Sequence, residues 1–438
     1  MAIRRTYKSI RVKQVDAAAI IEHCRRHKLD RVSAGIDVSK HDLFVVFRFS
    51  GQHFSQPIKV LQPAEIGLFV GLLSEINEQI QVQVGLESTG TYGDVIRFAL
   101  HTAGFDVFRI SGKAVSDYEE IFDGVPSKHD GKDAAMIAEL LDFGKATAWP
   151  WKGDDENDRR MAQAVDRLDI HTSLETMWTG RLEALLARHW PELTTFLQLT
   201  SATLISAVQH YVTPQAMSDD ENAAARLQAW GRGPLKREKI DRIVASAASS
   251  VGVPMTAAEQ AWLKEICGHI LEARRVQKAS RRELKELSSA NEIIGRMKVA
   301  LGEATACVLW VLLGDPRNYP CAGAYVKAAG LNLKVRSSGT QKGQLRITRR
   351  GPARVRRWMY FAALRAVQQP AVTKWFDAKK AKNERAGAML ATVAVMRKLL
   401  RAVWHTSTTG DEFKWGLLFP GRPIHSPRKE KTEMATTT

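Results

Sequence analysis

The sequence has few of the residues that build zinc sites and disulfide frameworks, and it has no long apolar run. It contains 4 cysteines in 438 residues, none spaced as CxxC, and its 12 histidines include no HExxH. This argues against a zinc ribbon or a disulfide scaffold and suits a reducing compartment. The longest apolar run, Ala304 to Leu313, is too short to span a bilayer, and no signal-peptide core follows the basic N-terminus. We therefore expect a soluble, cytoplasmic protein without a membrane partner.

Acidic residues are absent from one long segment. Between Pro316 and Phe376 there are 13 lysines and arginines and no aspartate or glutamate, although the chain has 47 acidic residues in all. The net charge of the chain is +17. Such an excess attracts polyanions, of which nucleic acid is the usual one. Bulk charge alone also fits a basic protein that is merely soluble.

The basic segment contains the side chains that we expect to hold nucleic-acid phosphates. Lysines neutralise phosphates, and each arginine can bind two phosphate oxygens in a bidentate manner. These side chains are Lys334, Arg336, Lys342, Arg346, Arg349, Arg350 and Arg354. Ser337 and Ser338 lie among them without a nearby histidine. A serine in such a loop usually only donates a hydrogen bond, but arginines that stabilise charge on phosphorus would allow a nucleophilic role. Trp358, Tyr360 and Phe361 are available for stacking, although their helical spacing favours a core position.

The length allows two or three domains. We divide the chain into a basic N-terminal extension (1–30), an α/β domain (31–150), a helical coiled-coil and linker region (151–290), a mainly helical C-terminal domain with a basic loop (291–410) and a partly disordered tail (411–438).

The α/β domain begins with strands. Residues 32–49 predict two strands around a polar turn at 39–42, and a third strand covers 53–60. A helix over 63–79, a strand over 81–86, a helix over 91–103 and a further strand then alternate. Three strands followed by alternating helices and strands indicate a mixed sheet with flanking helices. An RNase H-like layout fits this order.

The middle of the chain predicts long helices. Residues 155–190 carry apolar residues at helical spacing, and a capping box at Thr256 and Glu259 precedes a second helix that continues to about Ser289. These two helices fit a coiled-coil-like hairpin useful for dimerisation, or an ordinary helical bundle, equally well. Farther on, a helix–glycine–helix segment with Gly295 and Gly302 is a candidate element for binding DNA backbone.

Four carboxylates form the second candidate site. Asp37 lies on a strand and is flanked by apolar residues, Glu87 ends the strand VQVGLE, and Asp130 and Asp133 share one face of a helix start. Together they would hold two Mg²⁺ ions, because this cation prefers oxygen ligands, and such a pair stabilises both oxygens of a phosphodiester exchange. Taken singly, Glu87 fits a surface residue, and the two helix-start aspartates fit a favourable interaction with the helix dipole.

One rival explains part of the acidic pattern. GIDVSK also resembles the first phosphate loop of actin-like ATPases. That class requires a second glycine-rich phosphate loop and an adenosine-binding segment, and the sequence shows neither.

Four motifs in order resemble one family. GIDVSK, GLESTGTYG, KHDGKDAAMIAEL and YVKAAGLNLKVRSSGTQKGQLRITRRGPARVRRWMYFAAL follow one another between about residue 30 and residue 370. In them the chain resembles the DEDD recombinases of the insertion-sequence-110 family. The resemblance implies that Asp37, Glu87, Asp130 and Asp133 are the acidic tetrad. It also implies that Ser338, the serine followed by glycine, is the nucleophile, with Ser337 as the less favoured neighbour.

The resemblance implies further properties. Members of this family have a RuvC-like N-terminal domain, a coiled-coil segment and a C-terminal transposase domain, and they recombine DNA through a covalent serine–DNA intermediate. The acidic and serine sites meet between protomers of a dimer, and dimers assemble into a tetramer. A noncoding guide RNA, the bridge RNA, pairs with donor and target DNA. We therefore expect an RNA-guided, Mg²⁺-dependent transposase in a bacterial, nucleoid-associated setting.

Two alternative functions remain open. A junction-resolving nuclease would use the acidic site alone and hydrolyse DNA with water. A non-catalytic nucleic-acid-binding protein would use only the basic segment.

Overall fold

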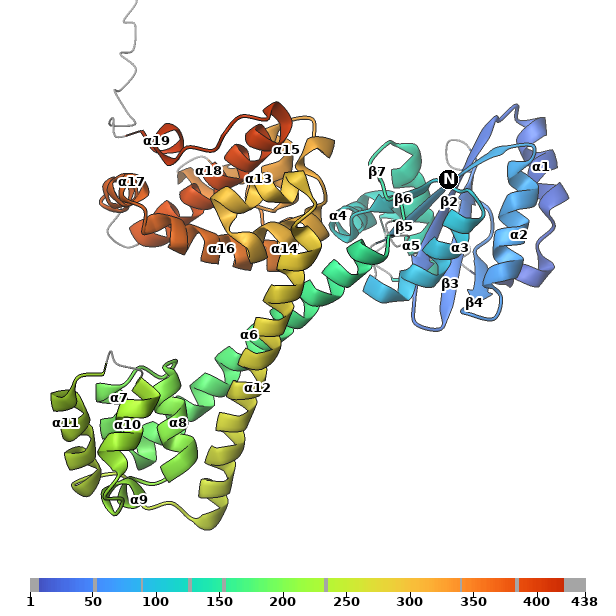
Figure 1. Ribbon diagram of the computed structural model, residues 1–438. Coiled ribbons are helices and arrows are strands. Elements are labelled where there is room, and N and C mark those ends of the chain that lie inside the picture. The colour runs from blue at the N-terminus through green and yellow to red at the C-terminus, as the bar shows by residue number, and fades with distance from the viewer. Residues whose placement is uncertain are drawn as a thin grey trace, which may run out of the picture. The chain divides into compact units, whose positions relative to one another are not determined.

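The computed structural model describes residues 8–49, 53–87, 90–124, 128–151, 155–231, 235–338, 341–382 and 386–420, except for the side chains of 335–345. The chain divides into two compact units, residues 1–154 and 155–438 (Figure 1). Among the described residues, no helix is both long enough and apolar enough to cross a membrane.

A seven-stranded mixed sheet forms the centre of the first unit. In spatial order its strands are β1 (Ile10–Arg11), β4 (Ile58–Leu61), β3 (Asp42–Arg48), β2 (Arg31–Val38), β5 (Gln81–Glu87), β6 (Val107–Ile110) and β7 (Thr147–Ala148). The strands β2, β3 and β4 pair antiparallel, whereas β2, β5 and β6 pair parallel. This mixed sheet is compatible with the expected RNase H-like fold. The third strand is shorter than expected, because β4 begins only at Ile58 and Phe54 makes an isolated bridge with Arg48.

Helices cover both faces of this sheet (Figure 1). Alternate residues of each strand point to opposite faces. One face packs against α1 (Ala17–Arg26), α2 (Ile66–Asn77) and α3 (Asp94–Thr102). The other face packs against α4 (Gly112–Asp123) and α5 (Asp130–Asp142). A 3₁₀ turn, η2 (Gly90–Gly93), precedes α3, so the expected helix begins three residues later than the sequence predicted.

Residues 10–26 pack into this unit, whereas the sequence led us to treat residues 1–30 as a separate basic extension. β1 pairs with β4, and the 3₁₀ turn η1 (Val12–Gln14) and α1 contribute Val12, Ile20 and Cys24 to the buried core. The Arg11 guanidinium donates to the buried carboxylate of Glu65 at 2.6 Å. The helix was not predicted, because the many basic residues of this segment obscure the apolar spacing of its buried residues in the sequence.

Two long helices begin the second unit. α6 (Glu156–His189) and α12 (Ala257–Ser288) lie side by side (Figure 1). Ion pairs join Arg167 to Glu283 and Glu175 to Arg274, so the helices run antiparallel. Both agree with the predicted ranges within two residues, and the capping box of Thr256 and Glu259 is present. The pair is a hairpin within one chain, and its use in dimerisation stays a prediction.

Five short helices connect the far ends of this pair. They are α7 (Pro191–Phe196), α8 (Ala202–Tyr211), α9 (Pro214–Ser218), α10 (Ala223–Gly231) and α11 (Arg237–Ala248). We call residues 191–248 the tip subdomain. It packs around a hydrophobic core of its own, which also includes residues at the ends of α6 and α12.

The remaining elements of this unit pack around another core, which includes the base of the helix pair. They are α13 (Glu292–Leu301), α14 (Glu303–Leu313), η3 (Pro316–Asn318), α15 (Ala322–Ala328), β8 (Leu333–Ser338), β9 (Gln341–Ile347), α16 (Ala353–Val367), α17 (Pro370–Lys380), α18 (Gly387–Thr409) and α19 (Trp415–Leu418). The tail expected at 411–438 therefore includes a short helix, and residues 421–438 lie outside the described part of the chain.

Two expectations for this region change. The basic loop is an antiparallel β-hairpin, β8 and β9, with an irregularity between Arg336 and Ser338. Gly302, which has a φ of 73°, joins α13 to α14, whereas Gly295 lies inside α13 and makes no turn. Trp358 is buried in the core, as its spacing predicted.

Candidate active site

Two glycines bring α5 onto the sheet. Gly35 of β2 and Gly85 of β5 are register partners on neighbouring parallel strands. A Cβ at Gly35 would lie 2.2 Å from the carbonyl oxygen of Ala134, and a Cβ at Gly85 would lie 3.1 Å from the Leu141 side chain. The absence of two side chains therefore creates the space that the helix occupies.

The strand ends beyond these glycines carry two acidic side chains. Asp37 lies two residues after Gly35, and Glu87 lies two residues after Gly85, so both point to the α5 face of the sheet. Ile36 and Leu86 are register partners, which places the two acids beside each other.

The first turn of α5 carries the other two acids, Asp130 and Asp133. They precede Ala134, whose carbonyl group lies against Gly35. The fully buried Lys132 forms an ion pair of 2.8 Å with Asp123 at the end of α4. This pair fixes the start of α5 against α4, because breaking a buried ion pair leaves an uncompensated charge.

The four acids are close enough to influence one another. Burial raises the pKa of Asp37 to about 7, and the charges that add to this shift are those of Asp133, Asp130 and Glu87. Burial also raises the pKa of Glu87, to which Asp133 adds, whereas Lys128 opposes the shift. Like charges held together in a partly buried site disfavour ionisation. The structure thus brings together the four acids that the sequence selected.

A glycine also makes room for Glu87. Gly112 begins α4, and a Cβ there would lie 2.2 Å from Oε1 of Glu87. The sequence analysis did not identify this glycine, because it lies outside the four motifs.

A fifth carboxylate was also missed. Glu119 of α4 adds to the raised pKa of Asp133, after burial and ahead of Asp130. Neither its residue type nor its spacing distinguishes Glu119 from other helix-surface acids in the sequence. Only the packing of α4 beside α5 reveals its place.

The donor set suits a hard divalent cation, because every candidate ligand is a carboxylate oxygen. Within the ranges that the structure describes, no three His, Cys, Asp or Glu side chains have an arrangement that could hold a metal ion. The four acids are therefore neighbours that repel one another, and their donor atoms have not converged on one point.

The predicted serine site lies in the second unit. The backbone of Ser337 and Ser338 ends β8, and Ser338 pairs with Gln341 of β9. The side chains of Arg336, Ser337, Ser338 and Lys342 lie outside the described ones. Their roles stay predictions.

The base of this hairpin is closely packed. Gly351 lies against Ala328, where a Cβ would be 2.3 Å from the carbonyl oxygen. Arg356 donates to the carbonyl oxygen of Gly351 at 2.7 Å. These contacts hold the two ends of the hairpin together.

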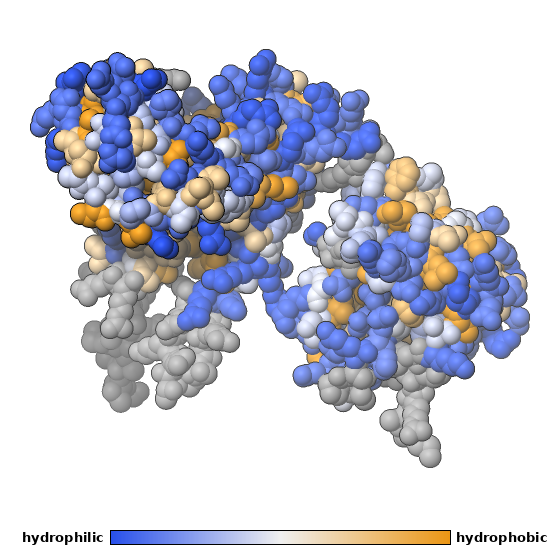
Figure 2. All heavy atoms as spheres, turned by 90° about the horizontal axis from the view of Figure 1, so that it is seen from below, coloured by the Kyte–Doolittle hydropathy of each residue, from blue (hydrophilic) through white to orange (hydrophobic). Residues whose placement is uncertain are grey.

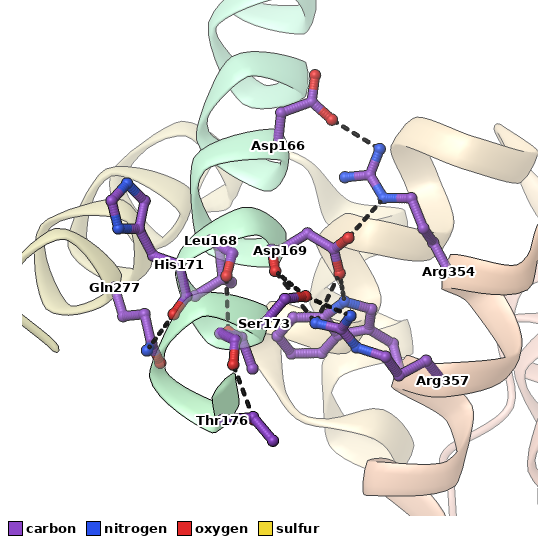
Figure 3. Close-up of polar contacts among 11 residues, drawn as sticks. Asp166, Leu168, Asp169, His171, Ser173, Thr176, Gln277, Arg354 and Arg357 are labelled. Atoms are coloured by element: carbon purple, nitrogen blue, oxygen red, sulfur yellow. Dashed lines mark hydrogen bonds and ion pairs between the residues drawn. The ribbon is translucent and has the colours of Figure 1, made fainter. Parts of the chain in front are cut away.

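The five predicted phosphate contacts whose side chains the structure describes fall into two groups. Lys334, Arg346, Arg349 and Arg350 are exposed at or near the hairpin base. Arg354 instead contacts two acids of α6 (Figure 3): its guanidinium lies 2.7 Å from Asp166 and 3.1 Å from Asp169. Its charge is balanced within the protein, and a role in nucleic-acid binding stays a prediction.

The surface turned to the viewer in Figure 2 is mostly hydrophilic, with hydrophobic residues in small groups. Together with the net charge of +17, such a surface favours a charged partner over an apolar one.

Comparisons with known proteins agree with this architecture. A family model described as a transposase, the DEDD transposase domain of IS110, matches residues 34–191. A second model, described as the transposase of the IS116/IS110/IS902 family, matches residues 297–378. The chain is also 24% identical over 290 residues to an uncharacterized 43.6 kDa protein of insertion element IS110 from Streptomyces coelicolor, covering 64% of this chain and 71% of that protein.

The mixed sheet is compatible with a DEDD transposase domain, and the two matches support a transposase, an enzyme class that cuts and rejoins DNA. The two models together cover more than half of the chain, in the order expected of one protein. These matches support an IS110-family transposase.

Proposed function

We propose that this transposase is an RNA-guided DNA recombinase that joins DNA through a phosphoserine intermediate. The observation that carries the proposal is the clustering of four acids at the strand ends and the start of α5, in a chain that matches two transposase family models. Carboxylates that are held close together, so that their pKa values are raised, are typical of functional sites.

In this proposal Asp37, Glu87, Asp130 and Asp133 would hold two Mg²⁺ ions. The bound ions would supply charge stabilisation for both oxygens of the phosphodiester exchange. The role of the protein is to keep the carboxylates together: Gly35 and Gly85 admit α5, and the ion pair of Lys132 with Asp123 holds its first turn.

The chemical step is a transesterification at phosphorus. The Ser338 hydroxyl oxygen forms a bond to the phosphorus of a DNA phosphodiester, and the bond to one deoxyribose oxygen breaks. That oxygen leaves as a hydroxyl group and takes up a proton, while the serine hydroxyl loses one. A hydroxyl group of the exchanged strand then attacks the phosphoserine, which restores the serine and the phosphodiester. Lys334, Arg336, Lys342, Arg346, Arg349, Arg350 and Arg354 would neutralise the phosphates.

The partners in this proposal are donor DNA, target DNA and a noncoding guide RNA. Base pairing would select the sequence, and the protein would bind backbone and shape. The acidic domain, the helix pair and the C-terminal domain with the serine would act in a dimer that assembles into a tetramer, in the nucleoid of a bacterial cytoplasm. The family resemblance supports these points.

Strand cleavage with single variants separates this function from its rivals. Purified protein, Mg²⁺, guide RNA and element-end DNA are mixed, and cleaved and rejoined DNA are measured. We expect that both Ser338→Ala and Asp37→Asn abolish rejoined product, whereas Ser337→Ala retains it. Cleavage that persists in Ser338→Ala would favour a junction-resolving nuclease. Product formed equally without RNA would remove the guide from the proposal.

A further inference from the structure

Nearly all of the tip subdomain lies between the two matched family models, which end at residue 191 and begin at residue 297. It is nevertheless a built structure, with a core that includes Leu204, Leu227 and Ile240. A folded subdomain at the end of two long helices places a surface away from the core at the base of those helices (Figure 1).

An open pocket of about 600 Å³ lies in this subdomain, between α7 and the start of α11. Three cations line it: Lys236, Lys239 and Arg242. The lining also includes Thr195 and Phe196 of α7, and one carboxylate, that of Glu238. The positive charges therefore outnumber the negative one by three to one.

The three cations differ from the other basic residues nearby. Arg226 is paired with Asp220 at 3.0 Å, and Arg237 is paired with Asp241 at 3.0 Å. Lys236 and Lys239 are exposed and form no ion pair with any described residue. Arg242 is exposed, and its guanidinium lies 5.2 Å from the centre of the Phe196 ring. The ring orients a cation without neutralising it.

Their spacing makes them a continuous surface. Lys236 directly precedes α11, and Lys239 and Arg242 follow at intervals of three residues, which places neighbouring side chains on the same side of a helix. Three like charges on one side of a helix repel one another. A polyanion would offset this repulsion, whereas a small neutral ligand would not.

We propose that the tip subdomain binds the phosphodiester backbone of DNA through Lys236, Lys239 and Arg242. The open shape of the pocket fits a backbone that passes across it. We assign these phosphates to DNA because both matched family models are transposases. This proposal rests on that DNA substrate and is independent of the serine mechanism and of RNA guidance.

Binding of a labelled DNA duplex to the full-length protein, measured by fluorescence anisotropy at several salt concentrations without Mg²⁺, tests the proposal. The variant is Lys236→Gln/Lys239→Gln/Arg242→Gln. Each phosphate contact contributes about 0.9 to the slope of log K against log salt. This slope is negative, and we expect its magnitude to decrease by about 2–3 in the variant. The affinity for DNA should decrease about tenfold or more at low salt.

The matched control removes three charges that are already paired. Arg188→Gln/Arg226→Gln/Arg237→Gln alters basic residues in or beside the same subdomain, each with an acidic partner. Its slope should change by less than about 1. A second variant, Lys236→Arg/Lys239→Arg, keeps the charges and should keep the slope, and circular dichroism establishes that all variants fold.

Equal slopes for the two triple variants would overturn the proposal. The same measurement with an RNA duplex distinguishes the source of phosphate: a loss confined to RNA would overturn the assignment to DNA. The measurement contains no Mg²⁺ and records binding alone, so its outcome does not depend on strand cleavage. A failure of the recombination mechanism would therefore leave this result unaffected.

Discussion

At the scale of single residues, the position of α5 depends on a glycine. The absent Cβ of Gly35 leaves room for the backbone of Ala134, at a place where no side-chain movement could relieve a clash. We expect Gly35→Ala to destabilise the protein by about 2 kcal/mol or more, because the helix itself must move. Thermal unfolding measures the effect.

Gly71→Ala is the matched control for this substitution. It lies inside α2, and a Cβ there would meet nothing within 4 Å. In a helix interior the exchange should stabilise by about 0.5–1 kcal/mol. Equal effects of the two substitutions would show that Gly35 is not a packing contact.

Gly112 gives a prediction about activity. An added Cβ would meet Oε1 of Glu87, which is the far end of a flexible side chain. We expect Gly112→Ala to turn that carboxylate away, at a cost in unfolding free energy below about 1 kcal/mol, and to lower DNA cleavage at least tenfold. A variant that loses stability but keeps cleavage would contradict this account.

The pKa of Asp37 predicts how stability depends on pH. Because the pKa is raised to about 7 in the folded protein from an ordinary value of 3.8, the folded state binds more protons than the unfolded state between these values. Stability contributed by the protonated group is therefore lost as pH rises through this window. The loss is at most about 4 kcal/mol, since one pKa unit corresponds to about 1.4 kcal/mol.

Asp37→Asn removes this titration. In metal-free buffer we expect the variant to melt at a higher temperature than the unchanged protein at pH 8, and the difference should shrink toward pH 4.5 because Asp37 is then neutral. Melting curves across this range measure it. A difference that stays constant with pH would contradict the raised pKa.

The sequence selected the four acids as an ordered set on predicted strands and a helix start, because Glu87, Asp130 and Asp133 taken singly also fit ordinary surface or helix-start roles. It did not predict Gly112 and Glu119, whose roles arise only when α4 packs beside Glu87 and α5. The raised pKa of Asp37 could not be predicted either, because it depends on burial and on three charges that are distant in the sequence.

At the scale of elements, Asp169 joins α6 to α16, the helix that follows the serine hairpin (Figure 3). It accepts a hydrogen bond of 2.8 Å from Trp358 Nε1, and it lies 3.1 Å from Arg354 and 3.2 Å from Arg357. Its side chain is only 13% exposed. We expect Asp169→Asn to destabilise the protein by about 1–3 kcal/mol, because two arginines lose their shared counter-charge.

Asp166→Asn is the control, because Asp166 pairs with the same Arg354 but its side chain is 57% exposed. Exposed ion pairs contribute at most about 1 kcal/mol. Urea unfolding of both variants measures the difference. If Asp166→Asn lowers the unfolding free energy as much as Asp169→Asn does, burial does not determine how much each aspartate contributes to stability.

Helices were predictable from the sequence where apolar residues recur at a regular helical spacing. The apolar spacing of α6 and α12, and the capping box that begins α12, gave both helices almost to the residue. β1 and α1 were missed because basic residues dominate their composition. β8 and β9 were expected as a loop, because glycines and basic residues are poor strand formers. Each of these strands pairs only with the other, so no neighbouring strand in the sequence pattern indicated them.

At the scale of the whole molecule, the two predicted sites lie in different units of the chain. The four acids belong to residues 1–154, and the serine hairpin belongs to residues 155–438. A hydrolytic nuclease would need only the first unit. In the proposed mechanism, one reaction requires both units.

The most direct test is to trap the covalent intermediate. Protein, Mg²⁺, guide RNA and end-labelled element DNA are mixed, denatured without protease and separated, and the labelled residue is mapped by mass spectrometry. The account predicts label attached to Ser338, retained in Ser337→Ala and lost in Asp37→Asn. Cleaved DNA that is free of protein, or an adduct whose yield is unchanged in Asp37→Asn, would contradict it.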